Sequence, residues 1–271
     1  MNHQMMEGME LLGFTAAISI GLILGLIGAG GSILTVPVMV YLFHIDPYLA
    51  TTYSLFIVGS TSLAGIIPYS LKKQVDYKTA LAFGIPSIIG VFLARTWIHP
   101  HIPEHLFDIA GYAVSKDMAL MLLFAVLMVF AAGNMIWKKE ATDEQEEQPS
   151  KSSYLLAVQG ILVGLIVGLV GAGGGFLIIP ALIIFNKMEL KTAIGSSLFI
   201  IALNSLFGFA SSNNIQEIHW WFMLAVTGIA LVGMLLGSWL SQKIAAQKLK
   251  PFFGYFVLLM AFWIIFQELS K

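Results

Sequence analysis

The sequence lacks cysteine and has few charged residues. Of its 271 residues, 11% are charged, 58% are hydrophobic and none is cysteine. A soluble domain carries about 25% charged residues, so this chain has too few to cover a water-facing surface. The absence of cysteine excludes disulfides, thiol catalysis and thiolate metal sites. A net charge of −1 gives no basis for nucleic-acid binding.

Long apolar runs take the place of a charged surface. Several of them reach the roughly 20 residues that an α-helix needs to cross a bilayer. The short alternating segments typical of a porin-like barrel are not seen. We therefore predict an all-α fold, that of a polytopic integral membrane protein in contact with the lipid bilayer. The first ten residues contain Glu7 and Glu10 but no Lys or Arg, so we expect a retained segment rather than a secretory signal.

The chain repeats itself at a fixed interval of 143 positions. Residues 21–37 read GLILGLIGAGGSILTVP, and residues 164–180 read GLIVGLVGAGGGFLIIP. Continued to Gly65 and Gly208, the alignment needs no gap and gives 19 identities in 45 positions. This agreement indicates a tandem duplication, an internal repeat whose shared centre is a glycine cluster inside a hydrophobic segment.

Each repeat contains four hydrophobic elements, and the first of them carries the glycine cluster. One clearly hydrophilic stretch lies between the two halves, and its charge density is typical of a solvated tether. We therefore divide the chain into a first membrane repeat, residues 1–137, a charged linker, residues 138–153, and a second membrane repeat, residues 154–271.

Lysine positions distinguish two topologies. If each glycine-containing element crosses the membrane, the loops that hold Lys78 and Lys243 lie on opposite faces, and the 14 basic residues divide seven to seven. If each is a re-entrant hairpin, 11 of them share one face, and the positive-inside rule favours this arrangement. The three on the other face are then Arg95, Lys116 and Lys271.

The re-entrant arrangement also predicts how the halves are oriented. Each repeat then has three full crossings, so the two halves are inverted relative to each other, a recurring plan of transporters. The Lys-rich face is expected to be cytoplasmic. Its loops are residues 72–78, 138–153, 187–191 and 243–250.

The glycine clusters Gly28–Gly31 and Gly171–Gly175 favour a break in the helix. Adjacent glycines lower helix propensity and free backbone groups, which a bilayer tolerates only where protein or a polar cavity surrounds them. The half-helix after each break then starts inside the membrane, where its free N–H groups and dipole can bind an anion. Close helix packing is the alternative. We favour packing for the four outer glycines, Gly21, Gly25, Gly164 and Gly168.

Hydroxyl and amide side chains recur in the second hydrophobic element of each repeat. Ser54 coincides with Ser197 under the shift, and Thr61 coincides with Asn204. Such groups can bind substrate or a neighbouring helix, or a hydroxyl can bond back to its own backbone. We find no Lys or Arg deep in any span, so hydroxyls and backbone amides would have to hold an anion. The predicted substrate site contains Gly28, Ala29, Gly30, Gly31, Ser32, Ser54, Thr61, Gly171, Ala172, Gly173, Gly174, Gly175, Ser197 and Asn204.

Other polar residues are interpreted as structural. Asp46 and Glu189 coincide under the shift, and we expect both to cap helices. His99, His101 and His105 lie in a proline-containing loop over residues 98–117, where we expect no metal site. Because no nucleotide-binding, protease or esterase motif is present, we predict no cofactor and no enzymatic activity.

The motifs resemble those of the sulfite exporter TauE/SafE family, also called the toluene sulfonate uptake permease family. Both halves contain Gly-Leu-x-Gly-Ala-Gly-Gly-x-x-x-x-x-Pro, followed by Ala-x-x-x-Ser-Leu-Phe. The resemblance covers nearly the whole chain and implies a bacterial inner-membrane carrier for small anions such as sulfite or a sulfonate. The matching positions are Gly28, Ala29, Gly30, Gly31, Pro37 and Ser54, with Gly171, Ala172, Gly173, Gly174, Pro180 and Ser197.

Three functions compete at this point. The first is a secondary transporter that moves a small anion by alternating access between two inverted halves. The second is an anion channel whose selectivity comes from half-helix dipoles. The third is a membrane enzyme or a non-transport scaffold. H⁺ and Na⁺ are the candidate coupling ions, and a homodimer is the candidate assembly.

Overall fold

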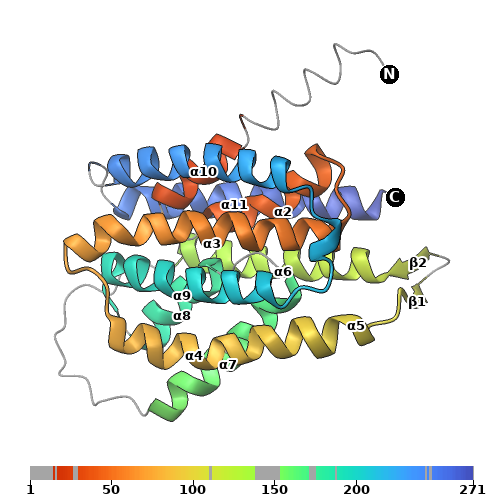
Figure 1. The fold of residues 1–271 in the computed structure, drawn as a ribbon, viewed down its shortest axis with the longest axis horizontal. Helices are drawn as coiled ribbons and strands as arrows, with labels where there is room; N and C mark the ends of the chain where they lie inside the picture. The colour runs from red at the N-terminus through yellow and green to blue at the C-terminus, as the bar shows by residue number, and fades with distance from the viewer. Residues whose placement is uncertain are drawn as a thin grey trace.

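The structure is a computed structural model that describes residues 15, 17–26, 30–109, 112–137, 153–170, 175–186, 188–241, 243 and 246–270. Helices make up nearly all of it (Figure 1). A short helix, Ala17–Leu26, precedes the labelled elements. In chain order these are α2 (Gly30–Pro37), the π-helix η1 (Val38–Leu42), α3 (Pro47–Leu71), α4 (Tyr77–Leu93), the π-helix η2 (Ala94–Ile98), α5 (His99–His101), β1 (His105–Ile109), β2 (Tyr112–Ser115), α6 (Lys116–Trp137), α7 (Ser153–Val170), α8 (Gly175–Asn186), α9 (Leu190–Ala210), the 3-10 helix η3 (Ile215–Glu217), α10 (Trp220–Ser241) and α11 (Ala246–Leu269).

Four helices in the described part of the chain are long and apolar enough to cross a membrane. A helix of 25 residues is about 38 Å long, which exceeds the roughly 30 Å thickness of a bilayer core. This pattern supports the predicted polytopic helical membrane protein. The four spans are Pro47–Leu71, Tyr77–His101, Lys191–Ala210 and Trp220–Ser241.

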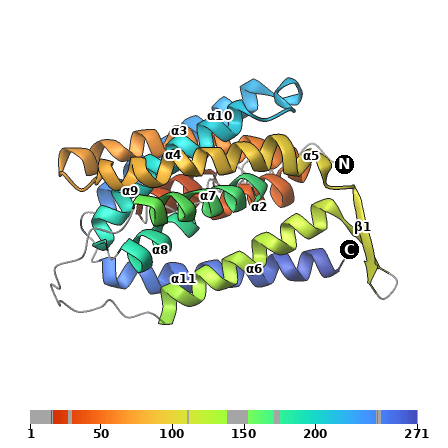
Figure 2. The same cartoon turned by 90° about the horizontal axis from the view of Figure 1, so that it is seen from below.

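A small β-hairpin corrects the prediction for residues 98–117. Strands β1 and β2 pair antiparallel where a loop with an interfacial turn was expected, so the fold is not purely helical. The hairpin follows α5 and leads directly into α6, at the end of the bundle where the C-terminal helix also ends (Figure 2).

The cap prediction is right for one repeat and wrong for the other. Asp46 accepts hydrogen bonds from the backbone N–H groups of Tyr48 and Leu49, at 2.9 and 3.2 Å, at the start of α3. Glu189 occupies the corresponding position before α9, but its side chain makes no cap hydrogen bond.

Helices α3 and α9, which coincide under the 143-residue shift, pack against each other in antiparallel directions. Along their contact, Gly59 faces Ser205, Leu55 lies beside Gly208, and Gly65 lies beside Leu198. Residue numbers thus rise along α3 as they fall along α9, as the two ribbons in Figure 1 also show. The homologous helices of the two repeats are therefore the central antiparallel pair of the molecule.

The outer glycines form close helix contacts between the two repeats, as predicted. A Cβ at Gly164 in α7 would overlap the Ser87 carbonyl oxygen in α4. A Cβ at Gly21 in the first helix would overlap the Ala230 carbonyl oxygen in α10. Because Ser87 and Ala230 also coincide under the shift, the first hydrophobic element of each repeat packs on the third hydrophobic element of the other.

The buried residues form two apolar clusters. One cluster joins η1, α3, α6, α10 and α11, with Phe124 and Met128 of α6 fully buried in it. Figure 2 shows α6 and α11 side by side along one edge of the bundle. The second cluster joins α3, α4, α8 and α9 around Phe83, Leu182 and Ile200.

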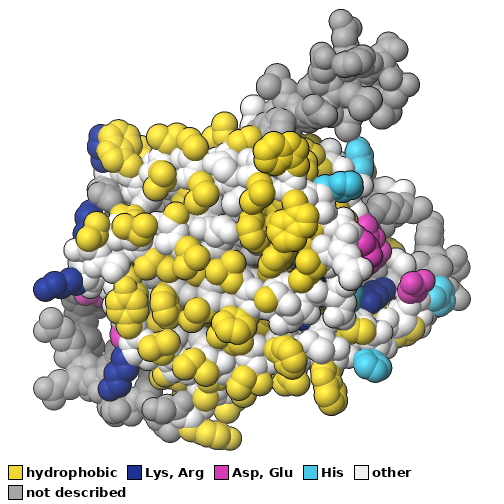
Figure 3. Space-filling view, viewed as in Figure 1, with side chains coloured by type: hydrophobic (Ala, Val, Ile, Leu, Met, Phe, Trp, Pro, Cys, Tyr) yellow, Lys and Arg dark blue, Asp and Glu magenta, His cyan; other side chains and the backbone are white. Residues whose placement is uncertain are grey.

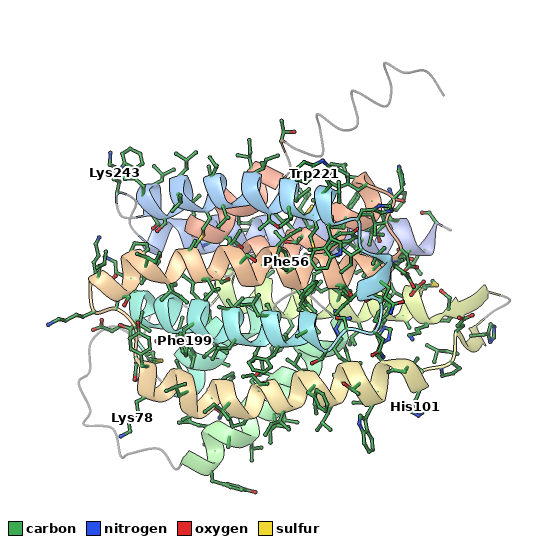
Figure 4. The ribbon with its side chains drawn as sticks, viewed as in Figure 1. Phe56, Lys78, His101, Phe199, Trp221 and Lys243 are labelled. Atoms are coloured by element: carbon green, nitrogen blue, oxygen red, sulfur yellow. The ribbon has the colours of Figure 1, made fainter. Side chains whose placement is uncertain are left out.

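The outer surface is apolar in the middle and charged at its ends. In Figure 3, hydrophobic side chains cover the centre, most Lys and Arg side chains lie at the left edge, and His and acidic side chains lie at the right. Lys78 and Lys243 share the left end in Figure 4, and His101 lies at the opposite end. We call these the lysine end and the histidine end, because the loop Lys72–Asp76 and His99–His105 mark them.

Candidate functional site

The glycine clusters are placed only at their edges. Gly28, Ala29, Gly171, Ala172, Gly173 and Gly174 lie outside the described residues. Gly30, Gly31 and Ser32 form the first turn of α2, and Gly175 is the first residue of α8. The described part of α2 thus begins at Gly30 and that of α8 at Gly175, and the break that the sequence predicts before Ser32 and Gly175 stays a prediction.

Two of the predicted hydroxyls bond to their own helix. Thr61 Oγ1 donates to the Ile57 carbonyl oxygen at 2.7 Å, and Ser197 Oγ donates to the Ile194 carbonyl oxygen at 2.8 Å. Both side chains are buried. These bonds satisfy the hydroxyl donors locally, which is the alternative to substrate binding that the sequence left open.

Four other buried serines have no such bond. The Oγ atoms of Ser54, Ser62, Ser205 and Ser238 have no hydrogen-bond partner within the described part of the structure. Buried polar atoms without partners are uncommon in proteins, and each calls for an explanation such as a bound water, ion or ligand.

A buried amide joins α9 to α4. Asn204 Nδ2 donates to Ser87 Oγ at 2.6 Å, while Asn204 Oδ1 has no partner among the described residues. The sequence analysis did not single out Ser87, because its equivalent in the second repeat is Ala230 and recurrence was the signal used. The hydrogen bond places Ser87 with the candidate site residues.

The four predicted side chains that the structure describes on α3 and α9 lie at three levels of the bundle. Thr61 and Asn204 lie near the level at which α3 faces α9, within about 3 Å along the helix axes of the Gly59–Ser205 contact. Ser54 lies toward the histidine end and Ser197 toward the lysine end. From the helical rise of 1.5 Å per residue, these two serines are about 20 Å apart along the bundle.

Arg95 corrects the prediction that no cation lies deep in a span. It belongs to the span Tyr77–His101 and is only 1% exposed. Its Nη2 donates to Thr51 Oγ1 of α3 at 2.9 Å. An ionisable residue within an apolar span is by itself a signal of function, and the sequence analysis missed it by assigning Arg95 to the membrane surface.

Membrane-length helices, two repeats with reciprocal contacts and polar groups buried between α3, α4 and α9 define a polytopic helical membrane protein. The chain belongs to the sulfite exporter TauE/SafE family, whose sequence profile matches residues 13–264.

Several relatives are similar over most of their length. A protein of Xylella fastidiosa, named "Probable membrane transporter protein", is 29% identical over 92% of each chain. "Probable membrane transporter protein YunE" of Bacillus subtilis is 27% identical over 94% of this chain and 98% of its own. A "Probable membrane transporter protein" of Haemophilus influenzae is 27% identical over 89% and 92%. No solved structure matches the chain.

Proposed function

We propose that the protein is a secondary transporter that moves a small anion, such as sulfite or a sulfonate, across the bacterial inner membrane. The family and the names of the relatives support membrane transport. The observation that carries the proposal is a group of buried polar atoms on α3 and α9, Ser62 Oγ, Ser205 Oγ and Asn204 Oδ1, which have no hydrogen-bond partner among the described residues. Groups of this kind are stabilised when a polar substrate passes between the helices.

Alternating access rests on two inverted repeats. The antiparallel packing of α3 on α9 supports this inversion, because equivalent helices that run in opposite directions are related by an axis perpendicular to them. In many secondary transporters such an axis lies in the membrane plane, and the two halves rock around a central site.

The re-entrant topology is part of the same proposal. Lys78 and Lys243 lie at one end of the bundle (Figure 4), which supports re-entrant over crossing first elements. By the positive-inside rule, the lysine end is the cytoplasmic end. The starts of α2 and α8, at Gly30 and Gly175, would then present half-helix N-termini to an anion inside the membrane.

Flux through proteoliposomes tests this function. We expect labelled sulfite, or one sulfonate, to exchange faster when the vesicles are preloaded with the same anion, and the dependence on a pH or Na⁺ gradient to identify the coupling ion. Saturable flux without counterflow would indicate a channel rather than a carrier. Absence of flux for every sulfur oxyanion and carboxylate offered would refute transport of this class.

Variants connect the flux to the glycine clusters. We expect Gly30→Val and Gly173→Val to abolish transport with the protein still inserted, because a branched side chain obstructs the approach of an anion to the backbone amides. Gly228→Val is the matched control, since a Cβ at Gly228 has no heavy atom within 4 Å. Wild-type flux in both cluster variants would place the substrate elsewhere.

A further inference from the structure

Arg95 is a buried cation with most of its hydrogen-bonding capacity unused. Its guanidinium offers five N–H donors, and the Nη2 bond to Thr51 accounts for one of them. Nε and Nη1 have no hydrogen-bond partner within the described residues. A buried charge is strongly unfavourable unless it is paired, so a bound anion would stabilise it.

Thr51 and Thr52 fix the orientation of the neighbouring polar groups. Thr51 Oγ1 donates to the Tyr48 carbonyl oxygen at 2.7 Å, which leaves its lone pair to accept from Arg95. Thr52 Oγ1 donates to Asn214 Oδ1 at 2.9 Å. Asn214 is 6% exposed, and its Nδ2 has no partner in the described structure. The first turn of α3 thus contacts the guanidinium through Thr51 and the Asn214 amide through the adjacent Thr52.

Further positive charge surrounds the ring of Tyr48. The Arg95 guanidinium carbon lies 5.4 Å from the ring centroid, and Lys116 Nζ lies 5.9 Å from it. His99 stacks on the same ring, with centroids 4.1 Å apart. Asp46, a carboxylate two residues before Tyr48, caps the first turn of α3. Two cations, Arg95 and Lys116, therefore lie beside the Tyr48 ring.

The duplication does not account for this cluster. Under the 143-residue shift, Arg95 corresponds to Ser238, Thr51 to Ile194 and Asn214 to Leu71. The scaffold is repeated, yet the cation and its donors occur in only one of the two equivalent places. The cluster is therefore specific to the histidine end of the bundle.

We propose that Arg95 and Asn214 form a binding site for a small oxyanion, one of the size of sulfate or sulfite. Two adjacent guanidinium N–H donors match two oxygens of such an anion in a fork geometry that a lysine cannot provide. The Asn214 amide supplies a further donor, and Lys116 adds to the positive field. Binding at this site does not depend on the proposed transport or on the glycine clusters.

The test is equilibrium binding of sodium sulfate and of sodium sulfite to the purified full-length protein, at constant ionic strength, with chloride as the comparison anion. We expect Arg95→Met to weaken oxyanion binding by about 10-fold or more, the loss expected for a charge-assisted hydrogen bond. Arg95→Lys keeps the charge and should still bind several-fold more weakly than the wild type. Asn214→Ala should also weaken binding, with Arg95 intact.

Lys78→Met is the matched control, because it removes one positive charge from an exposed residue at the lysine end. We expect wild-type binding from it. The proposal is overturned if the wild type binds neither oxyanion more tightly than chloride, or if Arg95→Lys and Asn214→Ala both bind like the wild type. If Arg95→Met does not fold, the binding measured for Arg95→Lys and Asn214→Ala decides whether the proposal stands. Binding without flux in vesicles would refute only the transport function.

Discussion

Gly164 and Gly21 sit where one helix meets the backbone of another. A Cβ at either position would overlap a carbonyl oxygen, that of Ser87 or that of Ala230. A carbonyl oxygen in a regular helix cannot move away without breaking the hydrogen bond it accepts. These two positions therefore tolerate no side chain, and they determine how closely the two repeats approach.

Gly164→Val is expected to destabilise the protein by about 3 kcal/mol or more, since overpacking against backbone leaves no flexible group to yield. The measurement is thermal unfolding in detergent, supported by size-exclusion chromatography. Gly228→Ala is the control, with nothing near its Cβ, and it should gain up to about 1 kcal/mol of helix propensity. An unchanged unfolding midpoint for Gly164→Val would contradict the close contact.

Asp46 and Glu189 occupy equivalent positions at the start of α3 and α9, but only the Asp46 side chain accepts cap hydrogen bonds. Asp46→Ala should lower the unfolding free energy by about 1 kcal/mol, because two backbone N–H groups of α3 lose their acceptor. Glu189→Ala should change it by much less, since its side chain makes no cap bond. Equal losses in the two thermal unfolding experiments would argue against the observed difference.

At the scale of helices, small residues that recur in both halves of the sequence predicted close helix contacts that recur in both halves of the structure. The outer glycines were correctly assigned to packing because small residues at one spacing appear in both halves. Arg95, Ser87 and Asn214 were missed, since each stands opposite an unlike residue in the other repeat. Arg95 also lies in the π-helix η2, where an extra residue per turn changes which face of the span it occupies. A periodicity argument assumes a regular helix and cannot place that side chain.

The contact between α3 and α9 can be tested by cross-linking, because the natural chain has no cysteine. A Cβ at Gly59 would lie 3.2 Å from the Ser205 Cβ, slightly closer than the 3.5–4.5 Å usual in disulfides. We expect Gly59→Cys with Ser205→Cys to form a disulfide under mild oxidation, with both thiols lost to maleimide titration. Gly59→Cys with Gly228→Cys should keep both thiols free. Persistence of the thiols in the first pair would exclude the antiparallel register.

At the scale of the whole molecule, the two ends of the bundle carry different charged side chains, mostly lysine at one end and histidine and acidic side chains at the other. The composition predicted a membrane protein because charge was scarce, and the structure places most of the described lysines at one end (Figure 3). Hydropathy alone fits two topologies, and the distribution of basic residues is what favoured the re-entrant one in the sequence. The shared position of Lys78 and Lys243 favours the re-entrant one.

Membrane-impermeant maleimide labelling of single-cysteine variants tests this topology in spheroplasts. Lys78→Cys and Lys243→Cys should both resist labelling until the membrane is permeabilised, because the positive-inside rule places the lysine end in the cytoplasm. His101→Cys should react in intact spheroplasts, since it lies at the opposite end of the bundle. Reversal of all three would invert the orientation and keep the fold. Labelling of Lys78→Cys and Lys243→Cys from opposite sides would instead require first elements that span the membrane, and the inverted-repeat mechanism would then fail with them.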